Sequence, residues 1–189
     1  SPHTLQYAYE WTAEEAIERS IKASLIAKEL GLYTCVFPID GSRNEINWYL
    51  NFVDQIVKNG HVDALILADT YGVLSPYGAA YFTKKVKEKI NKPLEIHFHN
   101  NFGMSTANTA AGVLNGGEVI HTTVLGLGEE AGNCPMEEIV MVLRAMYGID
   151  VGIKYNKICE VAQLVSEITG MEIPSSRPFV GSRIYTIEA

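Results

Sequence analysis

Two histidines, His97 and His99, are the residues whose type and spacing first suggest chemistry in this sequence. They belong to residues 94–103, an apolar run after Pro93 that ends in two asparagines and a glycine, the pattern of a short strand that runs into a loop. Side chains at i and i+2 of a strand leave from the same face, so the two imidazoles are expected side by side. Two imidazoles so placed can hold one divalent metal ion. The spacing alone fits equally well two polar histidines on a partly exposed strand.

Every predicted strand runs into residues that can ionise or form hydrogen bonds. These are Asp40 and Arg43 after residues 33–37, Asp69 and Thr70 after residues 64–68, His97 to Asn101 at the third strand, and Thr123 to Asn133 at the fourth, residues 119–124. In parallel α/β folds, ligands gather at the carboxyl ends of the strands. This convergence favours metal binding by His97 and His99 over the surface interpretation.

Structural roles stay open for several of these residues. Asp69 is equally suited to closing the turn ahead of Ser75. Asp40 and Arg43 are interpreted as a local ion pair. His121 lies within a predicted strand, where a hydrogen-bonded wall histidine is a commoner role than that of a third ligand.

The spacing of three glycines is similar to that of a dinucleotide-binding loop. The three are Gly126, Gly128 and Gly132, and their spacing differs from the G-x-G-x-x-G pattern by one residue. Glu129 and Glu130 would also lie where a pyrophosphate has to bind. A tight loop that brings backbone close to a ligand, and delivers residue 133 to the mouth of the site, is the better interpretation.

The elements that must position these residues follow from periodicity and capping signals. Helices are predicted from the Thr12 capping box to Leu30 and over residues 46–57, 76–90, 107–114, 135–147 and 156–169, whereas residues 1–11 are read as a loop. Strand and helix thus alternate four times, which implies parallel strands joined by crossovers. Four strands do not close a barrel, and a complete (β/α)₈ barrel needs about 250 residues. The α/β chain is therefore either an open doubly wound sheet or half of a barrel.

Composition narrows the possible classes. The chain has 189 residues, 47% hydrophobic and 20% charged, which is ordinary for a globular protein. A net charge of −7 argues against a nucleic-acid partner, and no apolar run reaches the length of a membrane span. Three widely spaced cysteines indicate reduced thiols and a cytoplasmic location. Because the chain opens at Ser1 within what reads as domain sequence, a fragment of a longer protein is expected.

Combined motifs of this chain resemble one family of enzymes. The motifs are His97-Phe-His99-Asn-Asn-Phe-Gly103 with Ala107-Asn108, Gly126-Leu-Gly128-Glu129-x-Ala131-Gly132-Asn133 with Glu137-Glu138, Asp40-Gly-Ser-Arg43, and Asp69-Thr70-x-Gly72. They are similar to those of the metal-dependent acyltransferase and lyase barrels: the isopropylmalate, homocitrate and citramalate synthases, with hydroxymethylglutaryl-CoA lyase more distant. The resemblance covers nearly the whole chain.

The resemblance implies that residues 1–170 are the second half of a (β/α)₈ TIM barrel and that residues 171–189 are an extended segment that leaves it. This segment, Pro174 to Gly181 with Glu188, is a feature of the synthases that the lyase lacks. The resemblance makes His97, His99 and Asn133 ligands of a divalent ion (Mg, Mn, Zn or Co). Thr70, Asp69 and Thr123 become substrate-binding residues, and no catalytic residue is assigned. The third ligand and a catalytic arginine belong to a motif of the front half, outside this sequence.

The implied reaction is a Claisen-type condensation of acetyl-CoA with a 2-oxo acid, in amino-acid biosynthesis, by a cytoplasmic homodimer. A metal-dependent lyase or aldolase that cleaves a carbon–carbon bond is the alternative, and a non-catalytic fragment that keeps the fold is another. Four departures from the family pattern bear on the substrate more than on the metal. Asn101 replaces a usual Asp, Glu130 a usual Arg and Leu125 a frequent Asn, and Cys35 stands where some synthases have Glu.

Overall fold

The sheet of this protein contains four parallel strands in sequential order. The computed structural model describes residues 1–186, so the end of the predicted exit segment, including Glu188, lies outside the described residues. The strands are β1 (Cys35–Val36), β2 (Ala64–Asp69), β3 (Leu94–Phe98) and β4 (Val119–Ile120), and the order in the sheet is β1-β2-β3-β4. A doubly wound sheet reverses its strand order at a switch point, whereas a barrel does not. The sequential order therefore selects the partial barrel of the two predicted architectures.

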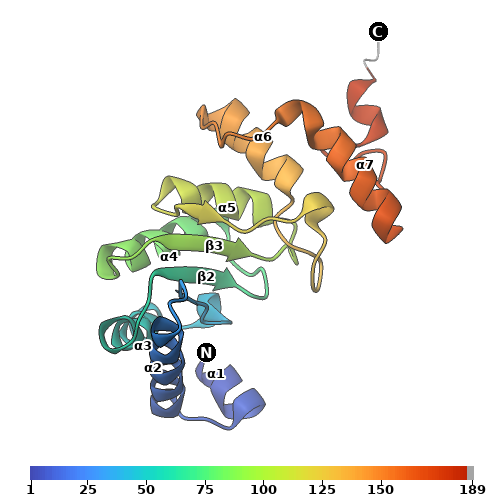
Figure 1. Ribbon diagram of the computed structural model, residues 1–189. Helices are drawn as coiled ribbons and strands as arrows, with labels where there is room; N and C mark the ends of the chain where they lie inside the picture. The colour runs from blue at the N-terminus through green and yellow to red at the C-terminus, as the bar shows by residue number, and fades with distance from the viewer. Residues whose placement is uncertain (187–189) are drawn as a thin grey trace.

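Helices join and flank the strands (Figure 1). Their bounds are α1 (Pro2–Thr4), α2 (Ala13–Glu29), α3 (Ile46–Asn59), α4 (Pro76–Lys89), α5 (Ser105–Leu114), α6 (Met136–Tyr147) and α7 (Ile158–Thr169). The predicted start signals are confirmed where they can be checked. Thr12 and Glu15 form the capping box of α2, and the hydroxyl of Ser75 accepts a hydrogen bond from the amide of Gly78 at the start of α4.

The main core lies on one face of the sheet. Leu65 and Leu67 of β2 and the alternate residues of β3 pack against α3 and α4, and all are fully buried or nearly so. Alternation along β3 then directs Glu95 and His97 to the opposite face. This second face is the one that a closed barrel would enclose. The apolar core and the candidate site are thus the two faces of the same strands.

Three predicted elements differ in the structure. The strand predicted over residues 33–37 is formed only at Cys35–Val36. Residues 1–11, predicted as a loop, contain α1 and a turn of π-helix at Leu5–Tyr9, because the hydroxyl of Ser1 caps α1 and Pro2 occupies its first position. The strand predicted over residues 119–124 pairs with β3 only at Val119–Ile120. Beyond it, the amide of Thr123 donates to the carbonyl of Cys134 (3.2 Å), which draws the chain away from β3.

The segment after α7 turns back onto α6. Gly170 ends α7 in the left-handed conformation, and a 3₁₀ turn follows at Ser182–Tyr185. Between them, Arg177 reaches Glu137 (3.3 Å) and Glu138 (3.4 Å) in the first turn of α6. The division of the chain at residue 170 stays a prediction.

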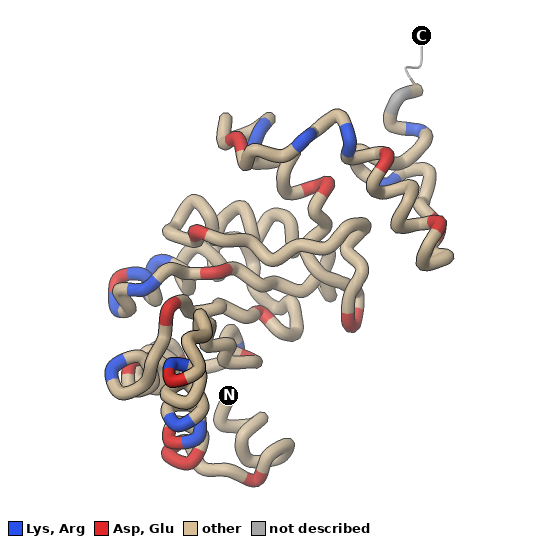
Figure 2. Tube along the Cα trace, in the orientation of Figure 1, with Lys and Arg blue, Asp and Glu red and all other residues tan. Residues whose placement is uncertain are grey.

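Acidic and basic residues both occur along α2, whereas residues 93–143 contain acidic residues and no Lys or Arg (Figure 2). The lysines near the end of α4 face acidic neighbours: Lys85 pairs with Glu88 (2.9 Å), and Lys87 contacts Glu118. This face of α4 is exposed to solvent, and these lysines are paired with acidic residues. Within the described residues, no helix combines the length and apolarity needed to cross a bilayer.

Replacing Leu67 with alanine tests the importance of the helix-facing side of the sheet. Leu67 is fully buried at the centre of β2, so its loss should lower the free energy of unfolding by about 2–5 kcal/mol through lost burial and a residual cavity. Urea denaturation followed by circular dichroism measures the change. The matched control Leu114→Ala, at a position that is 49% exposed, should change stability by less than about 1 kcal/mol. Equal losses at the two positions would contradict this view of the core.

Candidate metal and substrate site

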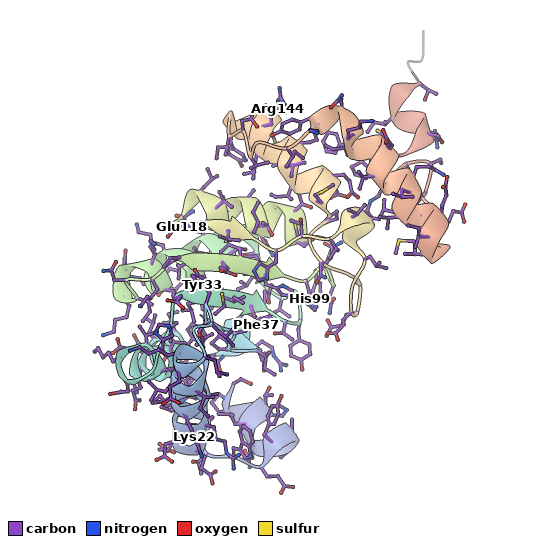
Figure 3. All side chains as sticks on the ribbon, viewed as in Figure 1. Lys22, Tyr33, Phe37, His99, Glu118 and Arg144 are labelled. Carbon is purple, nitrogen blue, oxygen red and sulfur yellow. The ribbon has the colours of Figure 1, made fainter. Side chains whose placement is uncertain are left out.

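The predicted ligands His97 and His99 meet at the carboxyl end of β3. Their Nε2 atoms are 3.1 Å apart, as the strand spacing predicts, and His99 is buried while His97 is half-buried. Figure 3 shows His99 where β3 runs into its loop, beside the loop that follows β4. The amide of His99 donates to the carbonyl of Asp69 (3.2 Å), and His99 forms an antiparallel bridge with Asn133. The backbone therefore brings residues from β2, β3 and the 126–133 loop to one place.

These donors fit a divalent ion. Neighbouring ligands around an octahedral ion with bonds of about 2.1 Å lie about 3 Å apart, close to the separation of the two Nε2 atoms. The Oδ1 atom of Asn133 is buried and has no hydrogen-bond partner among the described residues, so it is an oxygen donor without another use. Residues 1–186 contain no group of three His, Cys, Asp or Glu side chains placed to bind a metal together. The chain thus offers two imidazoles and one amide oxygen, and the predicted third ligand is not among the described residues.

Burial prepares His97 for this role. Desolvation, assisted by the neighbouring His99 and His121, lowers the pKa of His97 to about 4. The ring is therefore neutral at physiological pH. Only a neutral imidazole can donate a ring nitrogen to a metal ion.

Two residues outside the predicted site lie directly behind His97. The Nδ1 atom of His121 is 3.3 Å from Nδ1 of His97, and Nε2 of His121 is 2.7 Å from Oε2 of Glu95. His121 therefore lies on the side of the His97 ring that faces away from His99. This position fits the predicted hydrogen-bonded histidine in the wall of the site, and it does not fit a third ligand for an ion held between His97 and His99. Sequence reasoning missed Glu95. Its signal was an acidic residue in an apolar strand, two positions before His97 and so on the same face.

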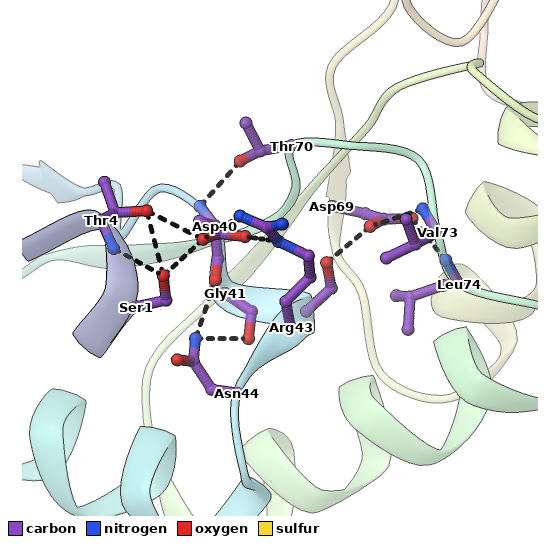
Figure 4. A network of polar contacts seen from close by, with 11 residues as sticks. Ser1, Thr4, Asp40, Gly41, Arg43, Asn44, Asp69, Thr70, Val73 and Leu74 are labelled. Atoms are coloured by element: carbon purple, nitrogen blue, oxygen red, sulfur yellow. Dashed lines mark hydrogen bonds and ion pairs between the residues drawn. The ribbon is translucent and has the colours of Figure 1, made fainter. Parts of the chain in front are cut away.

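The turn after β2 is built around Asp69 (Figure 4). Asp69 is fully buried, and its carboxylate accepts hydrogen bonds from the hydroxyl of Ser42 (2.6 Å) and the amides of Val73 (3.1 Å) and Leu74 (2.9 Å). Both oxygens are thus used by the protein itself. Of its two predicted roles, these contacts favour turn closure over a direct contact with substrate.

Thr70 follows on the open side of this turn. Its hydroxyl accepts a hydrogen bond from the amide of Asp40 (2.7 Å), and a hydroxyl that accepts one bond can still donate another. Gly72 allows the turn to approach β3, since its φ is +59° and a Cβ there would lie 2.8 Å from the carbonyl of His99. Thr70 thus lies on a turn that approaches His99, and no acceptor among the described residues takes its hydroxyl proton.

Asp40 and Arg43 form the ion pair that the sequence suggested. The guanidinium contacts both carboxylate oxygens at 2.6 and 2.8 Å and also lies over the ring of Tyr71, 4.0 Å from its centroid. Burial opposes ionisation of Asp40, but hydrogen bonds from Arg43, Ser1 and Thr4 outweigh it and lower the pKa to about 2. Asp40 is therefore a structural anion at the exit of β1.

The remaining predicted residue is Thr123, which lies between β4 and the 126–133 loop. Its Oγ1 is buried and has no hydrogen-bond partner in the part of the chain that the structure describes.

Two of the residues that depart from the family pattern contact each other: the amide of Asn101 donates to the carboxylate of Glu130. The same carboxylate lies 3.9 Å from Nδ1 of His99. The two departures from the family pattern, Asn101 and Glu130, are therefore in contact. The uncharged amide of Asn101 donates to the carboxylate of Glu130, whereas the usual Asp at residue 101 would repel it.

Comparison with known proteins places this site in context. The profile of the HMGL-like family matches residues 1–165. The (R)-citramalate synthase CimA of Methanocaldococcus jannaschii is 38% identical over all of this chain, which covers 38% of that protein. The homocitrate synthase AksA of Methanothermobacter thermautotrophicus is 34% identical over 98% of the chain and 47% of that protein. A probable 2-isopropylmalate synthase of Archaeoglobus fulgidus is 33% identical over 98% of the chain and 37% of that protein. The chain spans less than half the length of these curated relatives.

Solved structures agree on the fold. The HMG-CoA lyase of Bacillus subtilis superimposes with a TM-score of 0.80 at 21% identity, over 93% of this chain and 63% of that one. The hydroxymethylglutaryl-CoA lyase of Pseudomonas aeruginosa gives a TM-score of 0.78 at 18% identity, over 91% and 61%. Both likenesses extend over only part of the larger protein. The predicted partial TIM barrel is confirmed.

Replacing Asp40 with asparagine tests its role as a structural anion. A carboxylate whose pKa is lowered in the folded state stabilises it above the unfolded pKa of about 3.9, and this contribution disappears as the pH falls through about 2. Asp40→Asn should therefore lower the free energy of unfolding by about 1–2 kcal/mol at pH 7. The difference should shrink between about pH 4 and 2.

Denaturation curves at a series of pH values measure this difference. Glu88→Gln, which removes an exposed partner of Lys85, is the control and should change stability by less than about 1 kcal/mol. A loss for Asp40→Asn that stays constant from pH 7 to 2 would rule out the ionic origin.

Proposed function

The chain belongs to the HMGL-like family, and on that basis we propose that it is part of a divalent-metal-dependent acyltransferase that condenses acetyl-CoA with a 2-oxo acid. Its curated relatives are citramalate, homocitrate and isopropylmalate synthases at 33–38% identity. The single observation that carries the proposal is the meeting of the His97 and His99 Nε2 atoms, 3.1 Å apart, at the carboxyl edge of the sheet. Because the chain spans less than half of these relatives, the activity belongs to the larger protein.

His97, His99 and the Oδ1 atom of Asn133 would hold the ion, which we propose to be Mg, Mn, Zn or Co. Once bound, such an ion supplies Lewis acidity that polarises the keto carbonyl of a 2-oxo acid. The protein's own contribution is to keep the imidazole of His97 neutral and to shield both imidazoles partly from water. It also fixes the loop that carries Asn133, because the buried carboxylate of Glu137 accepts a hydrogen bond from the amide of Leu125 (3.0 Å).

Thr70 and Thr123 would bind the substrate from two sides. Within residues 1–186, no acceptor takes the hydroxyl proton of Thr70, and the buried hydroxyl of Thr123 has no partner. A 2-oxo acid presents a carboxylate and a carbonyl oxygen, both of which accept hydrogen bonds. Asp69 supports Thr70 by closing the turn on which it lies. The identity of the 2-oxo acid, the homodimer and the cytoplasmic location remain predictions.

Replacement of His97 tests the metal-dependent reaction in the full-length protein. His97→Ala should remove bound divalent ion and lower CoA release from acetyl-CoA by more than the roughly 10–100-fold that outer-shell substitutions cost. Metal analysis and a thiol-release assay with 2-oxo acids of different side-chain size and charge measure both effects. His61→Ala is the control, because His61 pairs with Asp63 ahead of β2, away from the carboxyl edge. If none of the 2-oxo acids in the panel supports CoA release by the natural protein, the synthase proposal is contradicted.

Thr70 offers a sharper test of substrate binding. Thr70→Val keeps the shape but removes the hydroxyl, so kcat/KM for the 2-oxo acid should fall by about 10–100-fold, the equivalent of one lost hydrogen bond to a charged group. Thr70→Ser restores the hydroxyl and should recover most of the loss. Steady-state kinetics with the 2-oxo acid varied separates the variants. Equal activity of the Val variant and the natural protein would show that Thr70 does not touch the substrate.

A further inference from the structure

A row of hydrogen-bonding groups extends behind His97, away from the proposed ion. It begins at Cys35, whose thiol donates to Oε1 of Glu95 (3.3 Å). Oε2 of the same carboxylate is 2.7 Å from Nε2 of His121, and Nδ1 of His121 is 3.3 Å from Nδ1 of His97. Glu95 is only 9% exposed, and both its oxygens are used within the row. The row connects two strands of the sheet, β1 and β3, with the segment after β4.

The proton positions along this row follow from what each group can do. An ionised carboxylate only accepts hydrogen bonds, so Nε2 of His121 must carry the proton in its bond with Glu95. With one proton placed there, Nδ1 of a neutral His121 is an acceptor. Nδ1 of His97 must then donate, and Nε2 of His97 is left with a free lone pair. That lone pair belongs to the nitrogen that lies 3.1 Å from Nε2 of His99.

We propose that Glu95 and His121 are positioning residues that hold His97 in its Nδ1–H tautomer and so present an unprotonated Nε2 to the metal ion. The inference rests on the proposed metal-binding function and assigns it two residues that the sequence prediction did not include. Metal-binding histidines commonly donate their second ring N–H to a carboxylate or carbonyl, which fixes tautomer and ring orientation. In this chain a second imidazole stands between the ligand and the carboxylate.

Packing restrains each member of the row. The amide of His121 donates to the carbonyl of Ile96 (2.9 Å), which holds residue 121 against β3. The ring of Phe37 meets that of His97 edge-on, with centroids 5.1 Å apart, on another side of the imidazole. Burial raises the pKa of Cys35 to about 11, which keeps its thiol protonated and therefore a donor to Glu95. The carboxylate thus has a defined partner on each oxygen, and the ring of His97 has a defined orientation.

The tautomer can be measured directly in the full-length protein. Long-range ¹H–¹⁵N NMR of histidine-labelled, metal-free protein at pH 8 distinguishes protonated from unprotonated ring nitrogens, with assignments from His97→Gln and His121→Gln. We expect the Nδ1–H tautomer at His97 and the Nε2–H tautomer at His121. An Nε2–H tautomer at His97 in the natural protein would overturn the inference. The tautomer is read in the natural protein, and the two variants serve only to assign its signals.

Two variants then test the direction of the row. Glu95→Gln replaces a group that only accepts by one that can also donate, at nearly unchanged shape, and should lower the fraction of His97 in the Nδ1–H form. His121→Leu removes the acceptor altogether and should do the same, while His61→Leu should leave the His97 signals unchanged. An unaltered His97 tautomer in folded Glu95→Gln and His121→Leu would show that the row has only a packing role.

Affinity for Co²⁺, measured against a competing chelator, separates this inference from the proposed function. We expect about 10–100-fold weaker Co²⁺ binding in His121→Leu and Glu95→Gln, and no change in His61→Leu. Loss of binding in His97→Ala with full affinity in both His121→Leu and Glu95→Gln would overturn the positioning role alone. Unchanged Co²⁺ binding in His97→Ala would overturn the metal proposal itself.

Discussion

Parallel pairing between β2 and β3 is the interaction on which the rest of the structure depends. Its register sets Ala68 beside His97 and Asp69 beside Phe98, so the turn that carries Thr70 begins where the two histidines lie. The same pairing fixes which face of β3 each residue occupies, because a shift by one residue would exchange the two faces. Phe98 and its apolar neighbours bury against α3 and α4, and this burial pins the register. The hydrophobic core therefore determines the geometry of the polar site without touching it.

Buried carboxylates near the site are each held by specific hydrogen-bond donors. Asp40 is ionised because Arg43 lies against it, and Glu137 is held by Arg177 and by the amide of Leu125. His97 is kept neutral mainly by burial. Charges left unpaired in such surroundings would cost several kcal/mol each. The protein thus surrounds its buried anions with hydrogen-bond donors and keeps the imidazole of His97 uncharged.

The loop after β4 depends on contacts from far along the chain. Leu125 has a φ of +60°, an unusual conformation for a leucine. The hydrogen bond from its backbone amide to the carboxylate of Glu137 supports this conformation. Arg177, from the segment after α7, pairs with that same glutamate. The position of Asn133 is therefore linked to the segment predicted to leave the barrel, which gives this segment a structural connection to the site.

Local patterns determined the alternation of strands and helices, the capping of α2 and α4, and the pairing of His97 with His99, since each depends on residues only a few positions apart. They did not determine the helical start at Pro2–Thr4, the short β4, or the partners of Glu95 and His121. The contact between Asn101 and Glu130 likewise joins two departures that the sequence shows only separately. Period and spacing report which face a side chain occupies, because backbone geometry repeats every two or 3.6 residues. Which side chains meet across that face depends on strand order, register and loop conformation, and only the tertiary structure decides these.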